Sequence, residues 1–207
     1  MSVEKIYEAV IEFEDDLVVD LVKQEIAAGT DLTQVLNNGL ISAMDEVGKR
    51  FSAGDLFVPE MLLAAQAMKA GLDELKPHLA QGTAATRGTV VIGTVKGDLH
   101  DIGKNLVAMI MEGAGFEVID VGMDADTEKF LQAATEKNAG VIAMSALLTT
   151  TMPAMGEVVK AIREQGLPIK TLVGGAPVTP AFAEKIGADA YCEDAPAAVD
   201  AARKFIA

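Results

Sequence analysis

An aspartate and a histidine lie two residues apart in the segment GTVKGDLHDIGKN, which covers residues 93–105. Asp98 and His100 follow an apolar run, TVVIG, and precede a stretch with helical periodicity, NLVAMIMEGAG. A carboxylate beside one imidazole nitrogen fixes the tautomer of the ring and raises the basicity of the other nitrogen. We therefore predict that His100 is a strong nitrogen donor presented from a loop.

One such donor suits a single axial bond to a metal that a macrocycle already holds. A bare ion would need more protein ligands, and the chain has one cysteine and two histidines. Gly103, at the predicted start of the following helix, leaves space for a large group to approach. Without Asp98, a histidine at this position would be interpreted as a helix cap.

Polar and glycine residues also lie at or just after the ends of two later apolar runs. Ser145 lies near the end of the third run and Thr149 follows it, and Gly174-Gly175 end the fourth. Ligands of parallel sheets bind beyond the carboxyl ends of the strands, so we expect these loops to meet the Asp98–His100 loop at one edge.

The elements that position these loops are predicted from alternating apolar runs and helical stretches. The runs are TVVIGTV, FEVIDVG, GVIAMSAL, IKTLVGG and ADAYC, and helical stretches lie near residues 105–113, 127–137, 155–165, 180–186 and 197–205. Continuous apolar strands alternating with helices are typical of a parallel sheet covered on both faces. Residues 89–207 are therefore predicted to form an α/β Rossmann-like (flavodoxin-like) domain with a five-stranded parallel sheet.

The N-terminal part of the chain has helical periodicity. Segments 3–12 and 14–28 are predicted helices, and two further stripes of apolar residues recur every three or four positions: Leu36, Leu40, Met44, Val47 and Phe51, then Met61, Ala65, Met68, Leu72 and Leu75. We predict a four-helix bundle over residues 1–80. A stretch containing Pro, Gly and Thr predicts a linker over residues 81–88.

Composition excludes several classes of function. The chain has 207 residues and a formal net charge of −14, which argues against nucleic-acid binding because phosphates would be repelled. No apolar run approaches the roughly 20 residues of a membrane span, and the N-terminus lacks the pattern of a signal peptide. Cys192, the single cysteine, cannot form an internal disulfide, so we expect a reducing cytoplasm and no membrane partner.

Taken together, D-x-H-x-x-G at residues 98–103, S-x-L at 145–147 and GG at 174–175 resemble the signature of cobalamin-binding domains that take the cofactor in the base-off, His-on form. The predicted bundle is similar to the helical cap of methyl-transferring corrinoid proteins and of cobalamin-dependent methionine synthase. The resemblance covers nearly the whole chain.

The resemblance implies a role for each matching residue. His100 replaces the benzimidazole of the cofactor as the lower cobalt ligand, Asp98 holds its ring, and Thr151 stands where the relay of methionine synthase has a serine. The corrin contacts are expected from Gly97, Asp98, Leu99, His100, Asp101, Ile102 and Gly103. The displaced nucleotide tail is expected to contact Ser145, Leu147, Thr149, Gly174, Gly175 and Ala195.

In the predicted bundle, Phe51 and Val58 match the apolar residues that cover the upper face of the cobalt, although Val58 replaces a leucine. The alternative is that both residues belong to the ordinary bundle core.

The implied function is to carry a methyl group on the cobalt of cobalamin, which alternates between methylcobalamin and cob(I)alamin. A substrate-specific methyltransferase loads the methyl group, and a second, corrinoid-to-acceptor methyltransferase passes it to tetrahydrofolate or a thiol. A reductive activation protein is a third expected partner, and the chain alone is not expected to be catalytic. The methyl donor (methylamine, methanol, betaine or a methoxylated aromatic), the acceptor and the oligomeric state stay open.

Three alternatives remain. The chain could be the cobalamin-binding subunit of a mutase, whose substrate barrel would be a separate chain. It could be a cobalamin-sensing regulatory module, although such modules use a tryptophan above the cofactor and this chain has none. A signalling receiver domain has the same predicted sheet but needs an aspartate where this chain has Ser145.

Overall fold

The computed structural model describes residues 2–79 and 86–206. The chain divides into two compact units: the first comprises Met1–Thr86 with Glu112–Gly115, and the second comprises Arg87–Met111 and Phe116–Ala207. The predicted linker over residues 81–88 falls largely outside the described residues. The boundaries 1–80 and 89–207 therefore stay predictions.

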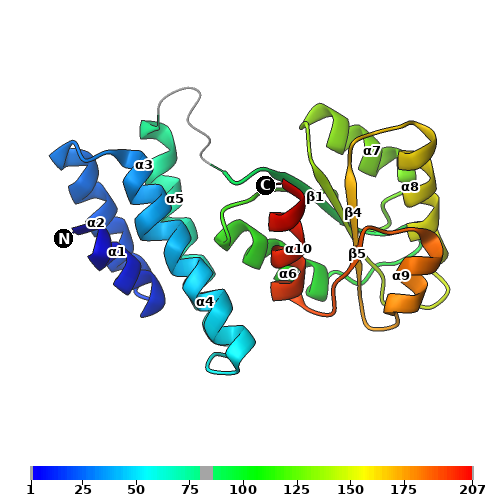
Figure 1. Cartoon of the computed structure of the whole chain (residues 1–207), viewed down its shortest axis with the longest axis horizontal. Helices are drawn as coiled ribbons and strands as arrows, with labels where there is room; N and C mark the ends of the chain where they lie inside the picture. Colours follow the sequence, from blue (N-terminus) through cyan, green and yellow to red (C-terminus); the bar gives the residue numbers. More distant parts are fainter. Residues whose placement is uncertain (1, 80–85, 207) are drawn as a thin grey trace. The chain divides into compact units, whose positions relative to one another are not determined.

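The first unit is helical, as Figure 1 shows at its blue and cyan end. Its long helices are α1 (Ser2–Ile11), α2 (Asp15–Ala28), α4 (Ser42–Ala53) and α5 (Val58–Leu75). The short helix α3 (Leu32–Gln34) and a π-helix, η1 (Val35–Ile41), run directly into α4, and a 3₁₀ turn, η2 (Lys76–His78), follows α5. Since α3, η1 and α4 form one continuous segment, the described residues of this unit form the four helical segments that the periodicity predicts.

The predicted apolar stripes form the core of this unit. Leu36, Leu40, Met44 and Val47 are all buried, as are the members of the second stripe, Met61, Ala65, Met68, Leu72 and Leu75. Phe51, the last member of the first stripe, is only half-buried. The stripe therefore leaves the core before α4 ends.

The second unit is a doubly wound α/β domain. Its strands are β1 (Thr89–Thr94), β2 (Glu117–Asp120), β3 (Val141–Ser145), β4 (Lys170–Gly174) and β5 (Ala190–Tyr191), and its helices are α6 (Ile102–Gly113), α7 (Thr127–Glu136), α8 (Pro153–Glu164), α9 (Pro180–Ile186) and α10 (Ala195–Ile206). All strand pairs are parallel. The helices α7, α8 and α9 cover one face of the sheet, and α6 and α10 cover the other (Figure 1). The predicted five-stranded parallel sheet is confirmed.

The order of the strands, β2-β1-β3-β4-β5, is that of flavodoxin-like domains and fixes where a ligand can bind. After β1 the chain continues to β2 on one side, and after β3 it continues to β4 on the other side. The two connections diverge between β1 and β3, which makes a topological switch point there. Thr94 at the end of β1 pairs with Ser145 at the end of β3, and Ser145 pairs with Gly174 at the end of β4. The loops after β1, β3 and β4 therefore start side by side at the same edge of the sheet.

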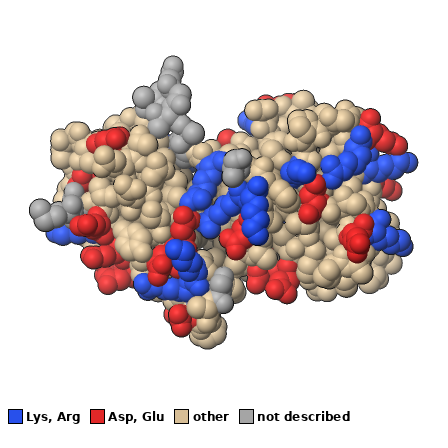
Figure 2. Space-filling view, viewed as in Figure 1, with Lys and Arg blue, Asp and Glu red and all other residues tan. Residues whose placement is uncertain are grey.

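The surface carries charges of both signs. On the face in Figure 2, acidic and basic side chains are interspersed, so the negative net charge is not gathered there into one continuous patch. Among the described residues, no helix combines the length and the apolar character that crossing a bilayer requires.

Candidate functional site

Asp98 is the centre of a hydrogen-bond cluster at the switch point. The side chain is fully buried. Its Oδ2 accepts hydrogen bonds from the backbone N–H of Leu147 (2.8 Å) and of Leu148 (3.2 Å) and from the Thr151 hydroxyl (2.7 Å). The carboxylate therefore joins the loop after β1 to the loop after β3.

The other carboxylate oxygen faces His100. Oδ1 lies 2.7 Å from the ring nitrogen Nδ1 and accepts from the backbone N–H of the same residue at 3.1 Å. Burial by itself would raise the pKa of the Asp98 carboxyl. The hydrogen bonds from Leu147, His100 and Thr151 outweigh this effect and hold that pKa well below its usual range. Asp98 is therefore an anion at neutral pH.

His100 is held on one side and open on the other. Its side chain is 52% exposed although its partner Asp98 is fully buried. Since Nδ1 is occupied by Asp98, Nε2 is the nitrogen left to bind another group. The Thr94 hydroxyl, buried at the end of β1, donates to the His100 carbonyl at 2.9 Å and so fixes the backbone of the loop. The result is an open imidazole nitrogen on a loop whose backbone is held by hydrogen bonds.

The two segments that Asp98 joins carry exposed apolar side chains, which form an apolar rim at this edge of the domain. Leu99 is 68% exposed, Ile102 86%, Leu147 45% and Leu148 42%. Exposed apolar clusters on a soluble domain indicate a surface that another group covers. Such a rim fits a large, flat and largely apolar molecule lying over the ring.

The surroundings of Gly103 show whether there is space for a large ligand beside the loop. A Cβ added at Gly103 would meet no atom of the chain within 4 Å. Gly103 lies in the first turn of α6, where alanine would favour the helix by up to about 1 kcal/mol, so the protein's own packing gives no reason for a glycine. The open space beside His100 is a reason, because a side chain there would narrow the approach to the ring.

The expectation for Gly174 and Gly175 needs a different physical explanation. The resemblance implies that both residues contact the displaced nucleotide tail. In the structure, a Cβ at Gly175 would lie 2.0 Å from the carbonyl oxygen of Ala146, and one at Gly174 would lie 2.8 Å from that of Cys192. Gly175 also has a φ of +127°, which side-chain-bearing residues rarely adopt. The close packing of neighbouring backbones already requires both glycines, whatever they contact in a ligand.

The remaining predicted residues of this unit lie along the same edge of the sheet or in the loops beyond it. Ser145 ends β3 and is half-buried, Thr149 is exposed in the following loop, and Ala195 is buried at the start of α10. Gly97 and Asp101 flank Asp98 and His100 in the loop, and Asp101 accepts from the Asn105 side chain at 3.0 Å. Their roles in binding stay predictions.

Phe51 and Val58 lie in the helical unit. Phe51 is near the end of α4 and half-buried, whereas Val58 begins α5 and is 38% exposed. The alternative that Val58 belongs to the ordinary bundle core is therefore wrong. The neighbouring Phe57, which the sequence analysis did not single out, is 69% exposed.

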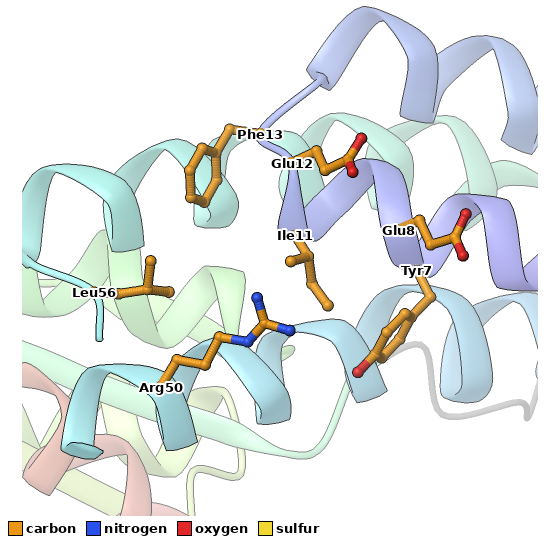
Figure 3. Close-up of a pocket in the computed structure, with 7 residues that line it drawn as sticks. All are labelled: Tyr7, Glu8, Ile11, Glu12, Phe13, Arg50 and Leu56. Carbon is orange, nitrogen blue, oxygen red and sulfur yellow. The ribbon is translucent and has the colours of Figure 1, made fainter. Parts of the chain in front are cut away.

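A cavity of about 570 Å³ also lies in the helical unit (Figure 3). It is lined by Tyr7, Glu8, Ile11, Glu12, Phe13, Arg50 and Leu56. The Arg50 guanidinium extends into it in Figure 3, and its Nε donates to Glu46 at 3.0 Å. None of the predicted site residues lines this cavity.

Two groups that the sequence analysis missed hold the site together. The backbone of Leu148 donates to Asp98, and Thr94 anchors the His100 carbonyl. Thr94 is a polar residue inside an otherwise apolar run, and that contrast is the signal that could have identified it. A backbone donor such as Leu148 leaves no signal in residue type.

The fold and this site define a class of protein: an α/β domain that presents one half-exposed imidazole, oriented by a buried carboxylate, at the edge of the sheet where ligands bind. Residues 88–203 match the family model of the B12 binding domain, and residues 2–76 match a second model with the same description. The chain therefore belongs to the family of B12-binding corrinoid proteins.

Relatives in this family are similar over almost their full length. The chain is 43% identical over 202 residues to dimethylamine corrinoid protein 1 of Methanosarcina acetivorans, and the match covers 96% of this chain and 94% of that protein. It is 42% identical over 195 residues to trimethylamine corrinoid protein 1 of Methanosarcina mazei, covering 92% of this chain and 90% of that one.

Solved structures agree with the fold. A chain of the methanol:cobalamin methyltransferase complex from Methanosarcina barkeri is 33% identical with a TM-score of 0.85, and the match covers 98% of this chain and 77% of that one. A cobalamin-binding protein from Desulfitobacterium hafniense is 28% identical with a TM-score of 0.80, and both chains are covered completely.

Proposed function

We propose that this chain is the methyl-carrying corrinoid protein of a methyltransferase system and that it binds cobalamin base-off, with His100 as the lower cobalt ligand. The observation that carries the proposal is the 2.7 Å contact between Asp98 and Nδ1 of a half-exposed His100. The open space at Gly103 and the exposed apolar rim at this edge of the domain fit a corrin lying against this loop.

Asp98 has two tasks in this proposal. As a buried anion it fixes the tautomer of His100, so that the lone pair for coordination resides on Nε2. It also stabilises a positive charge on the ring whenever Nε2 takes up a proton in place of a metal bond. Thr151 donates to the oxygen of Asp98 that does not face the ring. Its hydroxyl therefore modulates how strongly Asp98 attracts the imidazole proton.

When bound, the cobalt of the corrinoid supplies the nucleophile that takes up a methyl group and later gives it away. The residues of this chain orient that centre and shield it. Leu99, Ile102 and Leu147 would lose exposed surface against the corrin and exclude water from its lower side. The tail of the cofactor would lie near Ser145, Thr149 and Ala195, and Phe51 and Val58 would face the upper side.

The partners follow from the chemistry of a carrier. A substrate-specific methyltransferase would load the methyl group, a second methyltransferase would pass it to tetrahydrofolate or a thiol, and a reductive activation protein would restore oxidised cobalt. Relatives named as dimethylamine and trimethylamine corrinoid proteins favour a methylated amine as the donor.

The test uses the two histidines of the chain. Purified protein is loaded with hydroxocobalamin, and its absorbance spectrum is compared with those of His100→Ala and of His78→Ala, whose histidine lies in the η2 turn outside the site. We expect the wild-type and His78→Ala proteins to show the same histidine-ligated spectrum and His100→Ala to lose it. If the spectra of all three proteins are identical, His100 is not the cobalt ligand.

A further test addresses the methyl donor. Reduced, cobalamin-loaded protein is mixed with a trimethylamine-specific or a methanol-specific methyltransferase and the matching isotope-labelled substrate. We expect the label to appear on the corrinoid with the amine enzyme and not with the methanol enzyme. Label with the methanol enzyme alone would exclude trimethylamine and identify methanol as the donor.

A further inference from the structure

The loop that carries His100, residues 96–101, has two neighbours at the edge of the sheet. It follows β1, and β1 lies between β2 and β3. The loop after β3 supplies Leu147, Leu148 and Thr151 to Asp98. The last residue of β2 and the turn after it, residues 120–125, are together called the β2–α7 turn, and this turn adjoins the opposite side of the His100 loop.

Asp124 in the β2–α7 turn makes a reciprocal pair of hydrogen bonds with the His100 loop. Its Oδ1 accepts from the backbone N–H of Gly97 at 2.7 Å, and its own N–H donates to the carbonyl of Asp98 at 3.0 Å. Asp124 has a φ of +48°, in the left-handed region that residues with side chains seldom occupy. Backbone strain of this kind persists only where the surrounding contacts hold it in place.

The β2–α7 turn also holds the helix that follows His100. Lys104, in the first turn of α6, is only 2% exposed. Its ammonium group donates to Oδ2 of Asp120 and to Oδ1 of Asn105, the latter at 2.6 Å. Asp120 is itself fixed, because its Oδ1 accepts from the backbone N–H of Gly122 at 2.8 Å. The His100 loop is thus tied to the same turn before and after the histidine.

We infer that the β2–α7 turn is a second clamp on the cobalt-ligand loop and that Asp124 and Lys104 are positioning residues for His100. This inference rests on the proposed function. Asp98 fixes one ring nitrogen, but the direction of Nε2 also depends on the backbone that carries the ring. Asp124 and Lys104 fix that backbone on both sides of His100, so coordination needs the clamp as well as Asp98.

The experiment is an acid titration of the hydroxocobalamin-loaded protein, followed by absorbance. Protons compete with cobalt for Nε2, so weaker coordination raises the pH at which half of the bound cofactor loses its histidine ligand. Asp124→Gly removes the carboxylate but tolerates the positive φ. We expect its midpoint to lie about one pH unit above that of the wild type, since loss of one hydrogen bond to a charged group weakens coordination about tenfold.

Three variants control this result. Asp124→Asn supplies an amide oxygen in place of the carboxylate oxygen that accepts from Gly97 and also tolerates positive φ, so its midpoint should lie closer to that of the wild type than the midpoint of Asp124→Gly does. Asp126→Ala removes the cap of α7, where the Asp126 side chain accepts from the backbone N–H of Lys129 at 3.0 Å, and should leave the midpoint unchanged. Lys104→Met keeps the buried aliphatic stem and tests the second contact independently, with a shift in the same direction as Asp124→Gly.

The outcomes separate the two proposals. A wild-type midpoint in both Asp124→Gly and Lys104→Met, or an equal shift in Asp126→Ala, would overturn the clamp while His100 ligation stands. A wild-type protein without any His100-dependent band would overturn the proposed function and the clamp together.

Discussion

Two aspartates with mostly buried side chains lie at opposite ends of the parallel sheet: Asp98, which is fully buried, follows β1, and Asp189, whose side chain is 10% exposed, precedes β5. For both, burial alone would raise the pKa of the carboxyl, and hydrogen bonds outweigh burial and lower it. The donors to Asp189 are the side chains of Lys170 (2.9 Å) and Arg163 (2.8 Å) and the backbone and hydroxyl of Thr171 (both 2.9 Å).

The two clusters differ in what their donors can do next. Lys170 and Arg163 both donate to the Asp189 carboxylate, so the side chains bound to Asp189 are all partners within the chain itself. Asp98 instead holds a ring that is half exposed and has a second nitrogen. A buried anion with a lowered pKa is therefore not itself the mark of function. What distinguishes the Asp98 cluster is that one of its partners, His100, has a second ring nitrogen that can bind a group outside the protein.

The largest expected difference between the clusters comes from removing each charge. In Asp98→Asn, the amide N–H₂ must face one of the buried donors, so we expect the free energy of unfolding to fall by about 3 kcal/mol. Asp189→Asn should lower it by only about 1 kcal/mol, because the exposed cations can turn to water. Urea unfolding measures both values, and the spectrum of bound hydroxocobalamin should change in Asp98→Asn alone. If Asp189→Asn also loses the histidine-ligated spectrum, the claim that only the Asp98 cluster affects His100 is wrong.

Acid should affect both clusters alike. Because the folded pKa of each carboxyl is below its ordinary value of 3.8, the unfolded chain binds protons more readily than the folded one. The stability that these groups confer is present above about pH 4 and is lost as the pH falls through the folded pKa values. The contribution of these groups to the unfolding free energy measured between pH 3 and pH 6 should therefore be constant from pH 6 to about pH 4 and decrease below that. The decrease should be smaller in Asp98→Asn and in Asp189→Asn, and a wild-type slope in either variant would contradict the corresponding lowered pKa.

A matched pair of threonines gives a finer comparison. Thr151 and Thr171 are both buried and both donate a hydroxyl to an aspartate Oδ2, at 2.7 Å and 2.9 Å. Replacement by valine should lower the free energy of unfolding by about 1.5 kcal/mol in each case. The acid midpoint of cobalt–histidine coordination should move in Thr151→Val only, and Thr151→Ser should restore it. Equal midpoints in all of these variants would exclude Thr151 from the relay.

The smallest effect on stability is expected at Gly103. Since a Cβ there meets no atom of the chain, Gly103→Ala should leave the free energy of unfolding unchanged or raise it by up to about 1 kcal/mol. Its affinity for cobalamin should fall about tenfold or more through steric conflict with the ligand, as isothermal titration would measure. Gly156→Ala is the control, because its Cβ would make an ordinary contact at 3.4 Å with Ile186 in α8–α9 packing. If Gly103→Ala binds cobalamin with the wild-type affinity, the ligand does not approach the loop at Gly103.

The parts of this fold that sequence could predict are those governed by local periodicity. The five apolar runs became the strands of a parallel sheet, and the helical stripes became the core of the first unit. Phe51 departs from its stripe because periodicity does not indicate where a helix end leaves the core. The pairing of Asp98 with His100 was predictable because both residues belong to one short loop.

Other features of the site depend on contacts between distant segments, which residue types do not encode. Asp124 reaches Gly97 only because β2 neighbours β1, and a solvent-exposed aspartate in a turn has no distinguishing pattern. The sequence likewise could not reveal that Gly175 is required by the carbonyl of Ala146, since that reason depends on the distance between two backbones.

The most direct test of the account is electron paramagnetic resonance of the protein loaded with cobalamin and reduced to cobalt(II), with and without ¹⁵N-labelled histidine. Nitrogen bound along the axis splits the cobalt lines into triplets for ¹⁴N and doublets for ¹⁵N. Because the chain has only two histidines, His78→Ala leaves His100 as the sole labelled residue. We predict doublets in labelled His78→Ala protein. Triplets that persist after labelling would show that the ligand nitrogen comes from the cofactor's own base, and would contradict the account.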